Sequence, residues 1–138
     1  MTIRAIVPTA LLALMTTPGI SARQADAMNF YDCTEATPVE VVRLGVTICN
    51  AVPTAALMVR APAENLQIRE GALVMDLETD GVSAIAGLQP GDMLYRVGGI
   101  DVSGAKAAAK NLSNVSTSAD TIVNFLRGGR PYRVKLRR

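Results

Sequence analysis

Runs rich in β-branched and alternating apolar residues predict a chain built mainly from β-strands. Residues 51–70 are the exception, because two prolines, Pro53 and Pro62, bracket an apolar piece that suits either a short helix or a strand. Glycine pairs mark two turns, Gly98-Gly99 and Gly128-Gly129, and the second predicts a hairpin at the end of the chain. The predicted strands cover residues 41–49, 71–77, 93–97, 121–127 and 131–138.

Two short helices are predicted between these strands. Residues 82–88 allow one or two helical turns that end at Gly87. The second helix is predicted over residues 104–113, with Ser103 as its N-cap. One face of this second helix carries small or aliphatic side chains: Ala105, Ala108 and Leu112.

The first 27 residues have the organisation of a secretory signal peptide. An apolar stretch over residues 5–15 follows Arg4 and is too short to span about 30 Å of hydrocarbon as a helix. The dipeptide Pro18-Gly19 ends this stretch, and Ala25-Asp26-Ala27 has the small residues that a signal peptidase requires. We therefore predict cleavage after Ala27. An uncleaved anchor and a buried N-terminal helix are the alternatives.

Cleavage there would leave an extended segment over residues 28–40 and one domain over residues 41–138. Both cysteines, Cys33 and Cys49, lie after the cleavage point. In an exported protein an even pair of cysteines favours a disulfide, so we predict this bond and a periplasmic or secreted location. Closing a loop of this size stabilises a fold by roughly 3 kcal/mol. Two free thiols or a redox pair are the alternatives.

Composition excludes several functions. The chain has 138 residues, 49% of them hydrophobic, which suffices for one packed domain. It contains no histidine, so it holds neither a Ser-His-Asp triad nor a histidine-ligated metal. A net charge of +2 and 4% aromatic residues do not favour nucleic-acid binding. Asp76, Glu78 and Asp80 alternate, but we expect a solvated loop there. We predict no catalytic role, no metal and no cofactor.

A family resemblance rests on the segment from Ala84 to Leu94, Ala-Ile-Ala-Gly-Leu-Gln-Pro-Gly-Asp-Met-Leu. It resembles the Ala-x-x-Ala-Gly-Leu-x-Pro-Gly-Asp-x-Ile hallmark of bacterial PDZ domains, in particular those of HtrA-type periplasmic proteases. Gly71–Val74 and Leu126–Arg130 resemble a strand and a hairpin of the same family. The resemblance covers about residues 42–136. It implies a mainly β fold with two short helices, a PDZ-like and partly open antiparallel barrel or sandwich, here without a protease domain.

The resemblance also implies a peptide-binding site. In PDZ domains the C-terminus of a partner adds as a strand between a strand and a helix. The family's x-hydrophobic-Gly-hydrophobic loop matches Arg43-Leu44-Gly45-Val46. The last three of these residues would donate backbone amides to a carboxylate, and Arg43 would add positive charge. The residues implied for the strand side and the opposite wall are Thr47, Ile48, Ala105, Ala108 and Leu112.

Small wall residues and the absence of histidine imply a preference for an apolar last residue in the ligand. The implied partner is another envelope protein, bound by its C-terminus or an extended segment, and the implied role is that of an adaptor or regulatory subunit. A separately encoded envelope protease or its substrate is one such partner. The alternative is purely structural: the strand is buried and the helix face packs on the core. Helix periodicity does not distinguish a core-packing face from the wall of a binding pocket.

The last strand suggests a second kind of function. No acidic residue follows Asp120, whereas six basic residues do: Arg127, Arg130, Arg133, Lys135, Arg137 and Arg138. Such a strand suits an anionic surface such as lipid headgroups, in a scaffold protein whose peptide groove is vestigial. Its structural alternative is a solvated strand face whose charges discourage pairing at the edge.

Overall fold

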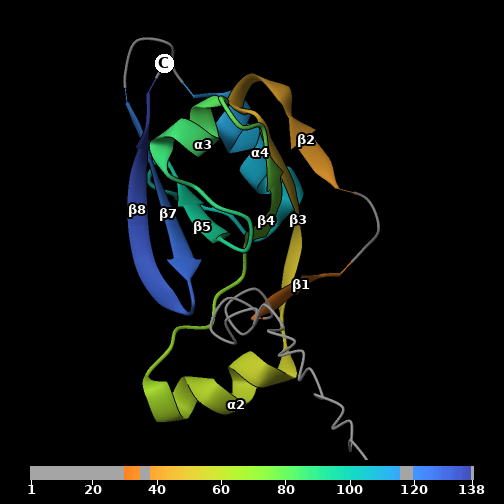
Figure 1. Cartoon of the computed structure of the whole chain (residues 1–138), viewed down its shortest axis with the longest axis vertical. Helices are drawn as coiled ribbons and strands as arrows, with labels where there is room; N and C mark the ends of the chain where they lie inside the picture. The colour runs from red at the N-terminus through yellow and green to blue at the C-terminus, as the bar shows by residue number, and fades with distance from the viewer. Residues whose placement is uncertain (1–29, 35–37, 116–119, 138) are drawn as a thin grey trace, which may run out of the picture.

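The computed structural model describes residues 30–34, 38–115 and 120–137, so the predicted signal peptide and its cleavage point lie outside the described residues. No helix in these ranges is long and apolar enough to cross a membrane. Figure 1 shows the elements, which in chain order are β1 (Tyr31–Cys33), β2 (Val39–Val41), the 3-10 turn η1 (Val42–Leu44), β3 (Val46–Pro53), α2 (Ala55–Glu64), β4 (Ala72–Leu77), α3 (Val82–Ala86), β5 (Met93–Val97), β6 (Ile100–Asp101), α4 (Ala105–Ser113), β7 (Thr121–Arg127) and β8 (Arg130–Leu136).

The strands form one antiparallel sheet in the order β1-β3-β4-β5-β7-β8, with β2 also paired to β3 and β6 to β5. The two ends of this order do not pair with each other, so the sheet stays open. This confirms the predicted mainly β, partly open class. Residues 51–70, whose pattern suited either a helix or a strand, contain a helix, α2. Its N-cap Thr54 accepts a hydrogen bond from the amide of Leu57.

The predicted single strand over residues 41–49 was wrong. The chain turns in its middle: β2 ends at Val41, η1 follows, and β3 begins at Val46 and continues to Pro53. The turn needs Gly45, which has a φ of +63°, in the left-handed region where a side chain is strained. A run of β-branched residues predicts strand but does not reveal a tight turn inside it. The described part of residues 28–40, for which an extended segment was predicted, contributes β1 and the first two residues of β2.

The predicted N-cap of the last helix was also wrong. The cap position of α4 is Gly104, which has no side chain to cap with. The amide of Ala105 instead donates to Oδ1 of Asn50, at 2.7 Å, from a residue on β3. A Cβ on Gly104 would lie 2.6 Å from that oxygen, so the glycine makes room for a cap supplied across the fold.

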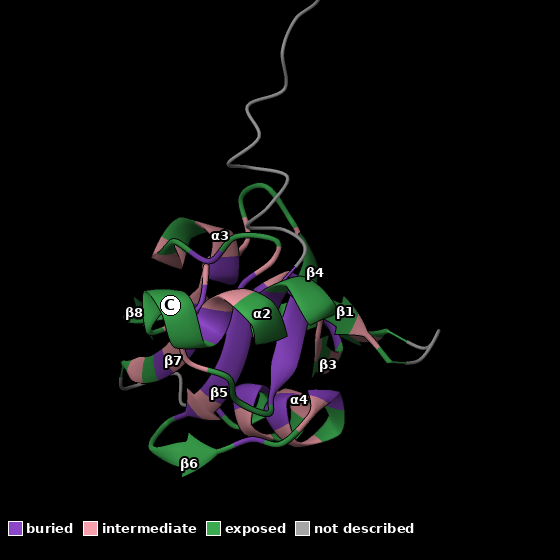
Figure 2. Ribbon diagram, turned by 90° about the horizontal axis from the view of Figure 1, so that it is seen from below, coloured by how far each residue is buried: buried purple, intermediate pink, exposed green. Residues whose placement is uncertain are grey.

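Two groups of buried side chains stabilise the domain. The upper cluster lies between the sheet and α4, and the lower cluster is covered by α2 and β1 at the opposite end (Figures 1 and 2). The upper cluster is centred on Val41, Leu44, Val46, Ile48, Ala105, Ala108 and Leu112, together with residues of β4, β5, β7 and β8. The lower cluster consists of Phe30, Tyr31, Cys49, Leu57, Ala61, Leu73, Met93, Tyr95 and Leu126.

The predicted disulfide is confirmed. Cys33 on β1 and Cys49 on β3 are bonded, with their Cα atoms 5.6 Å apart. The bond ties the first described strand to the strand beside it.

Candidate functional site: the outer edge of β3 and the face of α4

The outer edge of β3 is the place where a ligand strand was expected. One edge of β3 pairs with β4, and the other pairs with both β1 and β2. The β2 register is Val39 with Ile48, Glu40 with Thr47, and Val41 with Val46. Helix α4 packs against both β2 and β3. A strand of the same chain, β2, thus lies along the outer edge of β3 and against α4, at the place that is called the β3–α4 groove below. Figure 1 shows β2 beside β3.

Six of the nine predicted site residues are brought together in the upper cluster. They are all nearly fully buried: Leu44, Val46, Ile48, Ala105, Ala108 and Leu112. Val41 of β2, only 5% exposed, belongs to the same cluster. The apolar wall of the predicted pocket therefore contacts a valine of this chain, which the sequence analysis did not single out.

The turn before β3 holds the predicted carboxylate loop. The amide of Gly45 donates to the carbonyl oxygen of Val42 at 3.2 Å, so this donor is already satisfied. The carbonyl of Gly45 accepts from the amide of Glu78 at 2.8 Å, which joins the turn to the end of β4. A Cβ at Gly45 would lie 3.0 Å from Cβ of Glu78 and 3.2 Å from Cα of Gly81. Both its φ and this close approach require glycine here.

Arg43 and Thr47 lie outside the upper cluster. The guanidinium of Arg43 donates to the carbonyl oxygens of Ser113 and Val115, at 3.3 Å each. These carbonyls are at and just beyond the C-terminal end of α4, where unpaired acceptors and the helix dipole favour a cation. Arg43 therefore ties the turn to the helix. Thr47 is half-buried in β3, opposite Glu40 of β2 on one side and Asp76 of β4 on the other.

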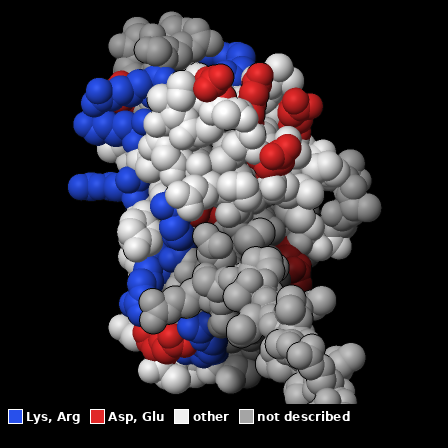
Figure 3. Space-filling view, in the orientation of Figure 1, with Lys and Arg blue, Asp and Glu red and all other residues white. Residues whose placement is uncertain are grey.

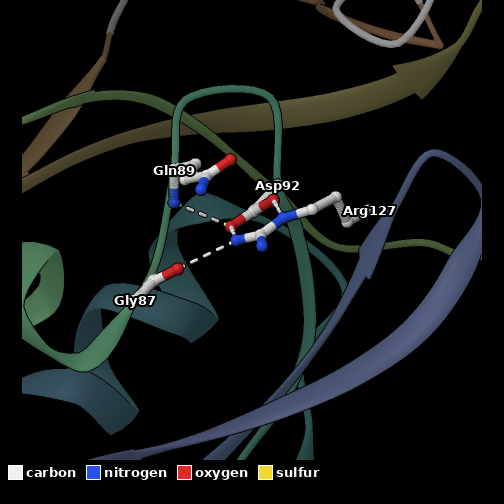
Figure 4. A network of polar contacts seen from close by, with 4 residues as sticks. All are labelled: Gly87, Gln89, Asp92 and Arg127. Atoms are coloured by element: carbon white, nitrogen blue, oxygen red, sulfur yellow. Dashed lines mark hydrogen bonds and ion pairs between the residues drawn. The ribbon is translucent and has the colours of Figure 1, made fainter.

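A polar network fixes the turn between α3 and β5, the core of the hallmark segment (Figure 4). Asp92 is 1% exposed, and its two carboxylate oxygens accept from Nε and Nη2 of Arg127, at 2.8 Å each. The same carboxylate accepts from the amide of Gln89, and Nη2 of Arg127 also donates to the carbonyl of Gly87. The hydrogen bond with Asp92 raises the pKa of Arg127. The network connects this turn to β7 and acts in the fold rather than at the groove.

Basic residues gather on the side of the molecule formed by β7 and β8 (Figure 3). Arg133 and Lys135 are exposed and, with Ile122, border a hollow of about 380 Å³. Within the described residues neither of these two cations forms an ion pair, whereas Arg137 lies 3.5 Å from a carboxylate oxygen of Asp120. Among the basic residues proposed for an anionic surface, Arg127 forms an ion pair with the buried Asp92.

No protein-family model matches the chain, and no curated protein matches it. Solved structures are similar in fold. The HtrA-type protease AlgW with a decapeptide matches 68% of this chain at a TM-score of 0.52 and 22% identity. The PDZ domain of HtrA3, bound to a phage-derived ligand of sequence FGRWV, matches 73% of it at a TM-score of 0.52 and 15% identity.

The matched region is 27% of the AlgW chain and 84% of the HtrA3 domain. The chain thus spans about a quarter of the AlgW protein and most of an isolated PDZ domain. At this level of identity the likeness concerns the fold. Together with the sheet order and the turn before β3, it shows that this chain has the PDZ-like fold of HtrA-type proteins.

Proposed function

We propose that the protein is a non-catalytic module that binds the C-terminus or an extended segment of another protein as a strand on the outer edge of β3, facing α4. One observation carries the proposal: this edge already accepts an antiparallel strand, β2, and seats an apolar side chain of that strand, Val41, against α4. A ligand strand would use the same backbone groups and the same apolar cluster. Both solved neighbours carry a peptide, which supports this assignment.

In this proposal the loop Arg43–Val46 receives the ligand's carboxylate. The amides of Leu44, Gly45 and Val46 are the donors, and a carboxylate oxygen takes the place that the carbonyl of Val42 holds on the Gly45 amide. Thr47 and Ile48 pair with the ligand backbone, while Ala105, Ala108 and Leu112 contact its last side chain. An apolar wall without a polar selector favours an apolar last residue. The HtrA3 ligand FGRWV, which ends in valine, is consistent with this preference.

The cellular role in this proposal is that of an exported adaptor or regulatory subunit. The disulfide between Cys33 and Cys49 supports an oxidising compartment such as the periplasm or the cell exterior. The partner would be another envelope protein, including a separately encoded protease or its substrate. A single groove of this size implies modest affinity, in the micromolar range of roughly −8 kcal/mol.

The test is binding of the oxidised protein to a peptide library displayed once with free C-termini and once with amidated C-termini. We expect binders in the free-carboxylate set alone, with a consensus that ends in Val, Leu, Ile or Phe. Calorimetry with a selected peptide ending in Val and its matched version ending in Asp checks the specificity. Equal binding of free and amidated peptides, or no binding in either set, would refute the carboxylate site.

A second candidate function rests on the exposed cations of β8. Arg133 and Lys135 favour binding to an anionic surface, because both are exposed and neither forms an ion pair within the described residues. Co-sedimentation with anionic and neutral vesicles at low salt tests it. Binding to anionic vesicles that is lost in Arg133→Glu with Lys135→Glu, but kept in the α4 control Lys106→Glu with Lys110→Glu, would favour this function. No sedimentation with anionic vesicles would end it.

A further inference from the structure

We propose that β2 is a built-in occupant of the β3–α4 groove, which a ligand must displace, and that the ligand carries the pattern of β2: an aliphatic residue at its last and third-last positions. This inference rests on the proposed function and specifies how the same site is regulated.

The direction and register of β2 match those of a ligand strand. β2 runs antiparallel to β3 and reaches the turn η1–Gly45 at its C-terminal end, with Val41 opposite Val46. A peptide whose carboxylate lies at that turn would run the same way along β3. Val41 therefore holds the place of the ligand's last residue, and Val39, opposite Ile48, holds that of the third-last residue. The Val42 carbonyl, bonded to the Gly45 amide, stands where a carboxylate oxygen would be.

The side chains of β2 alternate as a groove ligand would. Val41 is buried in the upper cluster, and Val39 is partly buried against the same cluster. Glu40, between them, is exposed on the outer face opposite Thr47. Because successive side chains of a strand point to opposite faces, a displacing peptide needs apolar residues at two alternate positions and tolerates a polar one between them.

Little anchors β2 apart from these contacts. It has three residues, and it is followed by Val42, which is 74% exposed. Upstream, the disulfide at Cys33 holds β1 in place independently of β2. β2 can therefore leave the groove while the turn, held by Arg43 and by the Gly45 carbonyl, and the rest of the sheet stay in place. Because a ligand binds only the open form, its apparent dissociation constant equals the intrinsic one divided by the open fraction.

Three variants of the full chain separate the closed and open forms. Val41→Asp opens the groove, because a carboxylate is unfavourable in the upper cluster and is solvated once β2 is displaced. Val59→Asp is the matched control, since it makes the same substitution at an equally exposed position, 74%, on α2 and outside the groove. Glu40→Cys with Thr47→Cys locks the groove: directly opposed residues of an antiparallel pair have Cα atoms about 4.5–5.5 Å apart, within the range for a disulfide.

The probe is the hexapeptide Ala-Thr-Pro-Val-Glu-Val with a free carboxylate, which reproduces residues 36–41. By titration calorimetry we expect Val41→Asp to bind it at least about tenfold more tightly than the native chain does. Val59→Asp should match the native chain, and the oxidised double-cysteine variant should not bind. Asp at the last or third-last peptide position should abolish binding, whereas Asp at the second-last position should not. Should Val41→Asp fail to fold, Val41→Ala serves in its place with a smaller gain of about threefold.

The possible outcomes separate the two proposals. Equal binding by the native and locked proteins would show that β2 does not obstruct the site, and would overturn this inference while leaving peptide binding in place. If the folded, opened variant binds neither the hexapeptide nor any member of the free-carboxylate library, the proposed function fails and this inference fails with it.

Discussion

β1 and β2 are two strands of equal length on the same edge of the same neighbour, yet they are held very differently. Each has three residues and each pairs antiparallel with β3. β1 is anchored by the disulfide of Cys33, by Phe30 and Tyr31 buried in the lower cluster, and by the guanidinium of Arg60, 4.9 Å above the ring of Phe30. β2 has one fully buried side chain, Val41.

Backbone pairing alone therefore does not hold an edge strand firmly in the sheet. A short strand on a sheet edge gains its stability from the side chains that it buries and from covalent bonds, because its hydrogen bonds largely replace bonds to water. By this criterion β1 is a fixed part of the domain. β2 is the part that a competing strand can replace. Four sets of substitutions test this contrast, in order of decreasing predicted loss of stability.

Phe30→Ala should remove the main side-chain anchor of β1. Deletion of a buried aromatic ring in a packed cluster leaves a cavity, so we expect the free energy of unfolding to fall by about 3 to 4 kcal/mol. Denaturation with urea measures it, and Tyr132→Ala, at a half-exposed aromatic position on β8, is the control. A loss below about 1 kcal/mol would mean that β1 is held no better than β2.

Replacing both Cys33 and Cys49 by serine should cost roughly 3 kcal/mol, because the loop that the disulfide closes is then free in the unfolded chain. Thermal unfolding of the variant and of the native protein measures the loss. Amide exchange then locates it: β1 should lose protection more than β2 does. Greater loss of protection in β2 would show that the disulfide anchors the whole segment.

Val41→Ala should destabilise the protein by only about 1 to 2 kcal/mol. The loss is limited because β2 can leave the groove without unfolding the rest of the sheet. Val42→Ala, one residue further along at an exposed position, should change stability by less than about 0.5 kcal/mol. A loss near 4 kcal/mol for Val41→Ala would make β2 an inseparable part of the core, and would argue against its displacement.

Tyr31→Phe should have the smallest effect, about 1 kcal/mol, because it removes one hydrogen bond, from the amide of Arg69 to the tyrosine oxygen at 3.3 Å. Burial raises the pKa of Tyr31 above 10.0. The stability linked to this group is therefore fully present below the pKa of the unfolded state, about 10, and is lost as the pH rises through the higher folded value. Denaturation of both proteins between pH 8 and about pH 11 should show a steeper decline for the native chain. Parallel curves would mean that β1 does not bury this hydroxyl.

Much of the fold could be predicted from short stretches of sequence. Gly87 ends α3 in the left-handed conformation, and Gly128-Gly129 forms the β7–β8 turn at positive φ, as their residue types require. β4 and β5 coincide closely with their apolar patterns. The cysteines pair as their even number and the expected export indicated. The turns, the helix end and the strands were predictable because each depends on neighbours within a few residues. The disulfide joins residues 16 positions apart and was predictable because the chain has two cysteines.

The arrangement of the candidate site was decided by tertiary structure. Asn50 caps α4 from 55 positions away, and Arg43 binds the other end of that helix from 70 positions away. Neither contact leaves a local pattern. The alternation of Val39, Glu40 and Val41 was present in the sequence, but a three-residue strand is too short to be predicted by period. The chain alone thus determined the class of fold, the turns and the disulfide. Which strand lies in the groove depended on register and packing between distant segments, because that choice is made by the side chains that meet there and not by those that are adjacent in sequence.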